Sequence, residues 1–302
     1  MNIPKPLCKG NTIGIVAPAS NLRDYTIKEV KEKLQSYGYN IKIGKSCNLK
    51  YRGYLAGEDE IRALDLENMF LDKEVDAIMC LRGGYGCSRI LNLINYDIVK
   101  QNPKIFLGFS DITALHIVFN QNCNLATYHG LMANRCIEWD EFSYNSMINS
   151  LNFKDELYIK NSSDINIKSL YEGVAEGEII GGNLTLLASS LGTEYEIDTN
   201  GKILFIEEVG EYIYRIDRLL TQLSLAGKFK DCKGIIFGDF SDCRKSNKDD
   251  FEIYDLQKEI AFKYKKPTIY NLNAGHCMPM VTIPFGIKCI LDANNCTIKF
   301  KK

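Results

Sequence analysis

The sequence predicts an α/β protein with two domains, the first built on a doubly wound parallel sheet and the second rich in β-structure. In the first half, short apolar runs alternate with amphipathic stretches, which is typical of parallel strands joined by helices. The chain has 302 residues, and a single hydrophobic core stops growing near roughly 250 to 300 residues. Residues 153–172 are polar and lack a helical period. We therefore place the junction there and expect domains at 1–160 and 161–302.

We describe the first domain as flavodoxin-like because strands and helices alternate along its length. A first strand in TIGIVAPA is followed by a helix over 25–37, where Ile27, Val30 and Leu34 recur at helical spacing and Gly38 ends the run. In a second helix, over 59–70, Ile61, Leu64 and the Leu66/Met69 positions are expected to face inward. The remaining expected elements are strands in NIKIG, VDAIMCL and IFLGF and helices at 90–94 and 112–118.

The second domain is expected to continue the α/β pattern and then to end in β-structure. It opens with GEIIGGNLTLLASSLG and continues with the strand ILFIEEV. A helix follows in which Ile216, Leu219, Leu220 and Leu223 are expected to face inward. The last expected elements are a strand in GIIFGDF, a helix over 254–264, and strands in VTIPFGIKCIL and CTIKF.

Charge and cysteine content limit the cellular compartment and the binding partners that we expect for this protein. Lys and Arg (37) nearly cancel Asp and Glu (38), so no overall positive field would gather a nucleic acid. Eleven cysteines form an odd set without a C-x-x-C pair, which indicates reduced thiols and a cytoplasmic protein. The apolar run at 13–17 is too short for a signal peptide, and no run approaches the roughly 18 residues of a membrane span. We expect neither a nucleic acid nor a membrane as partner.

Two turns that follow strands in the first domain are candidate parts of a site, because α/β sheets bind ligands at the carboxyl ends of their strands. The turn Arg82-Gly83-Gly84-Tyr85-Gly86 offers backbone N–H groups to a negative oxygen. The turn GFSD places the Ser110 hydroxyl between a strand and a helix N-terminus. From position alone the favoured interpretation of Ser110 is a helix N-cap. Nucleophilic catalysis is the alternative, and it needs a base and an acid elsewhere in the chain.

Histidine supplies three candidates for that base. We expect His116 to be structural or exposed within its helix, and His129 either to line the site or to be a satisfied turn residue. His276 lies in a loop rich in Gly and Asn, where catalytic groups are often positioned. A zinc site at His276 and Cys277 is rejected because no second ligand pair occurs at metal spacing, so no metal is expected.

Glu207 and Glu208, at the end of ILFIEEV, are the candidate acids. Adjacent carboxylates at a strand end are more often solvated than catalytic. Because side chains alternate along a strand, the two carboxylates are expected on opposite faces, and one of them could enter a site.

Ordered motifs along nearly the whole chain resemble the LD-carboxypeptidases of peptidoglycan recycling, a serine peptidase family with a second branch of microcin C immunity peptidases. Eight blocks in matching order are far more specific than any one of them. They are TIGIVAPAS, YLAGEDEIRALDL, AIMCLRGGYG, IFLGFSDITALH, TYHG, GGNLTLL, LFIEEVGE with YRIDRLL, and GHCMPMVTIPFG.

The resemblance implies that Ser110 is the nucleophile, His276 the general base and Glu207 the acid that orients the base. In that family the second acid of the pair is commonly Asp, so Glu208 departs from the pattern and stays in reserve. The resemblance also implies an oxyanion hole formed by the backbone N–H groups of Gly84 and Asp111. Residues assigned to substrate binding are Gly83, Tyr85 and Asn183.

The implied reaction is hydrolysis of the L,D amide bond that releases terminal D-alanine from a muropeptide tetrapeptide, without a cofactor. One alternative is the immunity branch, acting on aminoacyl sulfamoyl adenylates, and another is a non-catalytic module that binds a nucleotide or phosphate. The family suggests a homodimer. Arg82, Arg215 and Arg218 could bind the substrate carboxylate, but structural ion pairs are the favoured interpretation.

Overall fold

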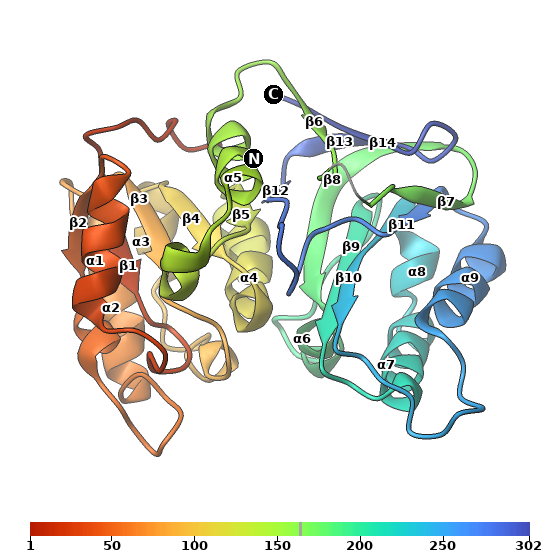
Figure 1. Ribbon diagram of the computed structural model, residues 1–302, viewed down its shortest axis with the longest axis horizontal. Helices are drawn as coiled ribbons and strands as arrows, with labels where there is room; N and C mark the ends of the chain where they lie inside the picture. Colours follow the sequence, from red (N-terminus) through yellow and green to blue (C-terminus); the bar gives the residue numbers. More distant parts are fainter. Residues whose placement is uncertain (163–164) are drawn as a thin grey trace. The chain divides into compact units, whose positions relative to one another are not determined.

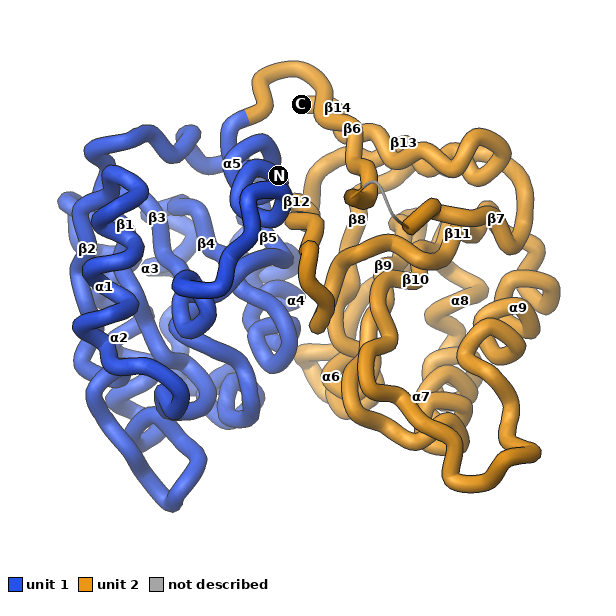
Figure 2. The backbone as a smooth tube through the Cα atoms, viewed as in Figure 1, with its two compact units in different colours: residues 1–152 blue, residues 153–302 orange. Residues whose placement is uncertain are grey.

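The computed structural model describes residues 1–162 and 165–302, and the chain divides into two compact units, Met1–Asn152 and Phe153–Lys302 (Figure 2). In the first unit, parallel strands lie in the order β2-β1-β3-β4-β5, which is the flavodoxin-like order predicted from the sequence (Figure 1). Their bounds are β1 (Thr12–Val16), β2 (Asn40–Ile43), β3 (Ala77–Cys80), β4 (Ile105–Gly108) and β5 (Thr127–His129).

Helices of the first unit fall into two groups, as a doubly wound sheet requires. Helices α2, α3 and α4 pack in sequence against one another, whereas α1 packs against β2 and against residues 133–138. The capping box of α1, in which Thr26 and Glu29 bond each other's backbone N–H, fixes where that helix begins. The helices are α1 (Ile27–Ser36), α2 (Asp59–Leu71), α3 (Tyr96–Gln101), α4 (Thr113–Cys123) and α5 (Glu141–Asn152).

Two expectations for this unit are wrong. Residues 90–94 form turns after a short 3₁₀ helix rather than an α-helix, because Asn95 caps a new helix, α3, by accepting the Asp97 N–H at 3.1 Å. In α2 the expected inward residue Leu64 is 55% exposed, whereas Arg62 is fully buried. The buried face of α2 is therefore partly polar.

Strands of the second unit lie in the order β6-β14-β13-β8-β9-β10-β11-β7, with β8 to β11 parallel and the flanking strands antiparallel. Residues 156–159 and 168–171 form the two edge strands of this sheet, β6 and β7. The strands of this sheet are β6 (Glu156–Ile159), β7 (Lys168–Tyr171), β8 (Val174–Asn183), β9 (Ile203–Val209), β10 (Gly234–Ser241), β11 (Thr268–Tyr270), β13 (Lys288–Asp292) and β14 (Thr297–Lys301). A further strand of this unit, β12 (Ile283–Phe285), is not part of the sheet.

Helix α7 packs against α6 and α8, and α9 packs against β7 and β10 (Figure 1). The bounds are α6 (Leu184–Ser189), α7 (Ile213–Leu225), α8 (Lys228–Asp231) and α9 (Ile253–Tyr264). No helix among the described residues combines the length and apolar character that crossing a membrane would require. All eleven cysteines are free thiols.

Candidate active site

Ser110 lies on a sharp turn at the carboxyl end of β4 in the first unit. Its backbone adopts a left-handed conformation with φ of 65°, which is unusual for a residue with a side chain. Phe109 is the N-cap of the 3₁₀ helix that follows and Ile112 is the N-cap of α4, and neither cap has a side-chain hydrogen bond. The N-cap interpretation of Ser110 is therefore wrong. A strained strand-to-helix turn of this kind is how α/β-hydrolases present a nucleophilic serine.

The glycine turn after β3 lies directly against Ser110. A Cβ atom added to Gly83 would come within 2.9 Å of the Ser110 Cβ and 3.4 Å of the Asp111 backbone nitrogen. Gly84 and Gly86 have φ values of 112° and 144°, which only glycine adopts without strain. Both the close approach and the backbone conformation therefore require glycine at this turn.

Side chains that follow two strands, and one from helix α2, hold the glycine turn in place. The Tyr85 N–H donates to the Ser20 hydroxyl at 3.1 Å, and the Cys87 N–H donates to the buried Asp111 carboxylate at 2.8 Å. The fully buried Arg62 guanidinium donates to the Gly86 carbonyl at 2.9 Å and also to the Pro18 carbonyl. Burial raises the pKa of Asp111, and the Cys87 N–H acts in the opposite direction.

Sequence reasoning did not identify Ser20, Arg62 or the Asp111 side chain as parts of this site. Ser20 follows β1 and the glycine turn follows β3, and the strand order reverses between these two strands. That topological switch point was the available signal for Ser20. No sequence pattern marked Arg62, because the carbonyl groups that it binds belong to residues distant in the chain.

Glu207 and His276 meet in the second unit. The carboxylate of Glu207, on β9, is fully buried, and its Oε2 lies 2.7 Å from His276 Nδ1. His276 follows Gly275, where φ is 130° and an added Cβ would come within 2.8 Å of the Glu207 Oε2. Glycine at this position therefore lets the histidine loop approach the carboxylate.

The Glu208 side chain has different partners from the Glu207 side chain, because adjacent side chains of a strand point to opposite faces. Its carboxylate accepts hydrogen bonds from the Asn183 amide at 2.8 Å, from the Thr185 backbone N–H at 2.8 Å and from the Thr185 hydroxyl at 2.6 Å. It thus caps the start of α6, where a negative charge is favourable. Both glutamates are buried, so the expectation that adjacent carboxylates would be solvated is wrong. Of the two, Glu207 contacts His276.

Charges around His276 stabilise its protonated form. Burial by itself lowers the pKa of His276, but the hydrogen bond to Glu207 and the charges of Glu207, Glu208 and Asp239 raise the pKa above its ordinary value of 6.5. Asp239 lies at the end of β10, and burial raises its pKa. A base paired in this way is held in the tautomer that keeps its other ring nitrogen, Nε2, available to accept a proton.

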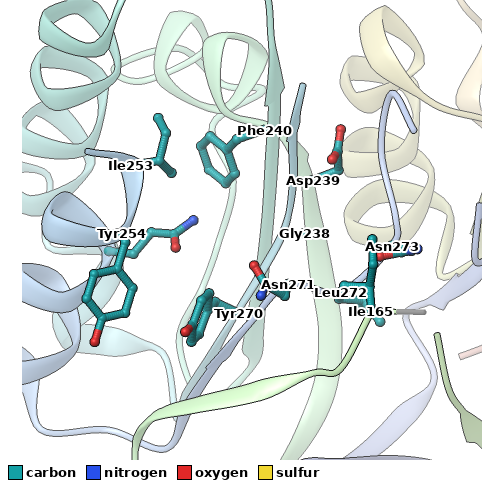
Figure 3. A pocket seen from close by; sticks show the side chains of 11 residues that line it. Ile165, Gly238, Asp239, Phe240, Ile253, Tyr254, Tyr270, Asn271, Leu272 and Asn273 are labelled. Atoms are coloured by element: carbon teal, nitrogen blue, oxygen red, sulfur yellow. The ribbon is translucent and has the colours of Figure 1, made fainter. Parts of the chain in front are cut away.

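A cavity of about 280 Å³ lies between β10, β11 and α9. Tyr254, Tyr270 and Phe240 form one side of it, and the Asp239 carboxylate points away from these rings (Figure 3). The carboxylate that influences His276 is therefore not directed into this cavity.

The other two histidines are both buried. His116 is fully buried, with Nε2 2.8 Å from the Gly108 carbonyl oxygen, and burial lowers its pKa to about 4. His129 ends β5 and is also fully buried, with its ring 5.8 Å from that of Phe109. The alternative that His116 is exposed is therefore wrong.

The residues assigned to substrate binding fall in both units. Gly83 contacts Ser110 as described, and Tyr85 is 48% exposed beside Tyr54. Asn183 ends β8 opposite Glu207 and is the N-cap of α6.

Among the candidate arginines, Arg215 forms an ion pair with Glu211 at 3.4 Å, and Arg218 lies over the Tyr214 ring. Arg82 has neither kind of contact in the described part of the chain. There, neither Arg82 nor Arg218 has a carboxylate within ion-pair distance, so the expected structural ion pair is absent for both. Among the same residues, no group of three His, Cys, Asp or Glu side chains is arranged to hold a metal.

Comparison with known proteins gives a consistent family. The chain matches the LD-carboxypeptidase N-terminal domain over residues 13–130 and the LD-carboxypeptidase C-terminal domain over residues 176–291. It is 38% identical over 296 residues to the Bacillus subtilis (strain 168) protein named "Probable murein peptide carboxypeptidase", covering 96% of this chain and 91% of that relative.

Two solved proteins of different description share its fold. The structure of MccF in complex with glutamyl sulfamoyl guanosine matches with a TM-score of 0.91 and 25% identity, over 99% of this chain and 98% of the other. MccF of Escherichia coli, the microcin C7 self-immunity protein, is 29% identical over 323 residues, which cover 96% of this chain and 93% of that protein. The muramoyltetrapeptide carboxypeptidase of Oxalobacter formigenes matches with a TM-score of 0.84 and 26% identity, over 96% and 98% of the two chains. This chain therefore belongs to the LD-carboxypeptidase family and is a peptidase.

Proposed function

We propose that this protein is a serine LD-carboxypeptidase that releases terminal D-alanine from muropeptide tetrapeptides. The observation that carries the proposal is the Glu207–His276 pair at 2.7 Å. A buried carboxylate that orients an imidazole is the arrangement that activates a serine nucleophile. The strained turn at Ser110, with glycine backbone packed against it, supplies the other half of the chemistry.

In the proposed mechanism, His276 Nε2 takes the proton of the Ser110 hydroxyl as the oxygen attacks the scissile carbonyl carbon. The Gly84 and Asp111 backbone N–H groups stabilise the oxyanion, each contributing about 2.7 to 4 kcal/mol to lowering the barrier. The protonated imidazole then gives its proton to the amine of D-alanine, which leaves an acyl-enzyme on Ser110. Water deprotonated by His276 hydrolyses this ester. The mechanism requires Ser110 and His276 to come within hydrogen-bond reach during turnover.

The substrate class rests on the relatives. The 38% identical protein and one solved neighbour carry murein or muramoyl peptide names. The near-neutral net charge of the protein is compatible with such a substrate, because a small zwitterionic peptide does not need a strong electrostatic field to be captured.

Activity on an aminoacyl sulfamoyl nucleoside is the second candidate, favoured by the TM-score of 0.91 with MccF. The single tryptophan speaks against a nucleobase platform, because Trp139 is 9% exposed and packs beside Tyr37 and Tyr144. Incubating the protein with a tetrapeptide and with glutamyl sulfamoyl adenosine in parallel decides between the two substrates. We expect faster turnover of the tetrapeptide.

Replacing the nucleophile tests the mechanism directly. Ser110→Ala is expected to reduce D-alanine release by at least about 10³-fold, measured by mass spectrometry, while the thermal midpoint stays close to that of the unchanged protein. Near-normal release by this variant would refute the proposal. Labelling of Ser110 by a fluorophosphonate would exclude the non-catalytic nucleotide-binding alternative.

We further propose that the protein works in the cytoplasm as a homodimer. Eleven free cysteines support a reducing compartment. Sedimentation equilibrium at micromolar concentration tests the dimer, and a single species with the monomer mass of 34.3 kDa would refute it.

A further inference from the structure

Arg82 is a half-buried cation without a carboxylate partner in the described part of the chain. Its Nη1 donates to the Asn21 carbonyl at 3.3 Å, and its Nε is buried without a hydrogen-bond partner among the described residues. The arginines at 62, 89, 135 and 215 each pair with a carboxylate. Leaving a partly buried guanidinium unpaired costs stability, so a function is the reasonable explanation.

A second cation adds to the positive charge at this point. Burial lowers the pKa of Arg82, and the nearby charge of Arg23 lowers it further, with Asp24 acting in the opposite direction. Arg23 itself is exposed. Two neighbouring guanidinium groups repel each other in the absence of an anion, and a bound anion would relieve that repulsion.

Arg82 also lies beside the proposed oxyanion donors. A Cβ atom added to Gly84 would be 3.9 Å from Arg82 Nη2. In a substrate that ends one residue after the cleaved amide, the terminal carboxylate carbon is three bonds from the scissile carbonyl carbon. These two carbons are therefore within about 4 Å of each other. A group that binds this carboxylate must adjoin the oxyanion donors, and Arg82 satisfies that condition.

We propose that Arg82 binds the C-terminal carboxylate of the substrate and that Arg23 strengthens the local field. This inference rests on the proposed carboxypeptidase function. It adds the residue that restricts cleavage to the C-terminal residue of the peptide substrate. Arginine suits the task because its planar guanidinium can donate two parallel hydrogen bonds to a carboxylate. A peptide that continues beyond the cleaved bond offers a neutral amide in place of the carboxylate and leaves the cation desolvated and unpaired.

The test compares two substrates that differ only at the terminal group: a tetrapeptide ending in D-alanine and the same peptide ending in D-alaninamide. We expect the unchanged protein to prefer the free acid by about 10²-fold or more in kcat/KM. Arg82→Gln should lose a similar factor on the acid and little on the amide, so that the preference disappears. Arg82→Lys keeps the positive charge but cannot donate two parallel hydrogen bonds, so it should recover part of the lost kcat/KM on the acid.

Arg135→Gln is the matched control, because Arg135 is an arginine of the same unit that pairs with Glu138. It should keep the full preference for the acid. Fluorophosphonate labelling of Ser110 at an unchanged rate shows that Arg82→Gln retains a folded site. Equal losses on both substrates, or an unchanged protein that cleaves acid and amide equally well, would overturn the inference while leaving the proposed function standing. Absence of D-alanine release from both substrates by the unchanged protein would instead refute the function.

Discussion

Glu207 Oε2 and His276 Nδ1 lie 2.7 Å apart, whereas the adjacent Glu208 carboxylate accepts hydrogen bonds from Asn183 and Thr185. Two neighbouring residues of one strand therefore have separate tasks. One carboxylate faces an imidazole and the other caps a helix. The separation follows from strand alternation, and it makes the two glutamates distinguishable by experiment.

Replacing each glutamate by glutamine should affect different properties. Glu207→Gln keeps the shape but removes the charge that holds and stabilises the imidazolium, so kcat should fall by about 10²- to 10⁴-fold. Glu208→Gln leaves N–H donors facing an amide and should lower the free energy of unfolding by about 1 to 3 kcal/mol, with kcat changed less than tenfold. For both variants, steady-state kinetics measure kcat and urea denaturation measures the free energy of unfolding. A larger kcat loss in Glu208→Gln than in Glu207→Gln would contradict the assignment.

The pH dependence of activity should report the His276–Glu207 pair. A general base acts when it is unprotonated, so kcat/KM should fall as the pH drops through the pKa of His276. Because the Glu207 bond and the neighbouring charges raise that pKa above 6.5, the midpoint should lie above 6.5 in the unchanged protein. In Glu207→Gln the midpoint should move to lower pH. If kcat/KM fell at low pH with the same midpoint in both proteins, a group other than His276 would control this pH dependence.

The His276–Glu207 pair also predicts the direction in which the stability of the folded protein changes with pH. A pKa raised by folding means that the folded protein holds the proton more tightly than the unfolded chain. The resulting stabilisation is fully present below the ordinary value of 6.5 and is lost as the pH rises through the raised pKa. The difference in thermal midpoint between the unchanged protein and His276→Gln should therefore shrink with rising pH across this range.

The sequence located the elements that carry Ser110, Glu207 and His276 because each follows a simple rule. Strands β4 and β9 end at residues 108 and 209, and polar groups near strand ends are candidates in any parallel sheet. His276 was marked by its loop, which is rich in Gly and Asn. The strand order was also predictable, since alternating strands and helices permit few topologies. The choice between Glu207 and Glu208 needed coordinates, because alternation separates the two faces without saying which one holds the histidine.

Buried charge was the feature that sequence patterns could not supply. Helix α2 shows an apolar periodicity that placed Leu64 inward, yet Leu64 is 55% exposed and Arg62 is fully buried. Hydrophobicity alone penalises a buried guanidinium, whereas here Asp59 and the backbone carbonyls of Pro18 and Gly86 compensate it. Those carbonyls come from turns remote in the chain. The unpaired state of Arg82 was hidden for the same reason.

Gly83 should be essential for activity although it offers no functional group. In Gly83→Ala the added methyl would lie 2.9 Å from the Ser110 Cβ and 3.1 Å from its hydroxyl oxygen, too close for either side chain to keep its place. The turn or the serine must shift, and a displaced oxyanion donor costs about 10²- to 10³-fold in kcat. Gly10→Ala is the control, since Gly10 also has a positive φ, 89°, but open space around it. It should lose about 1 kcal/mol of stability and keep full activity. Normal kcat in Gly83→Ala would show that the glycine turn does not form the oxyanion hole.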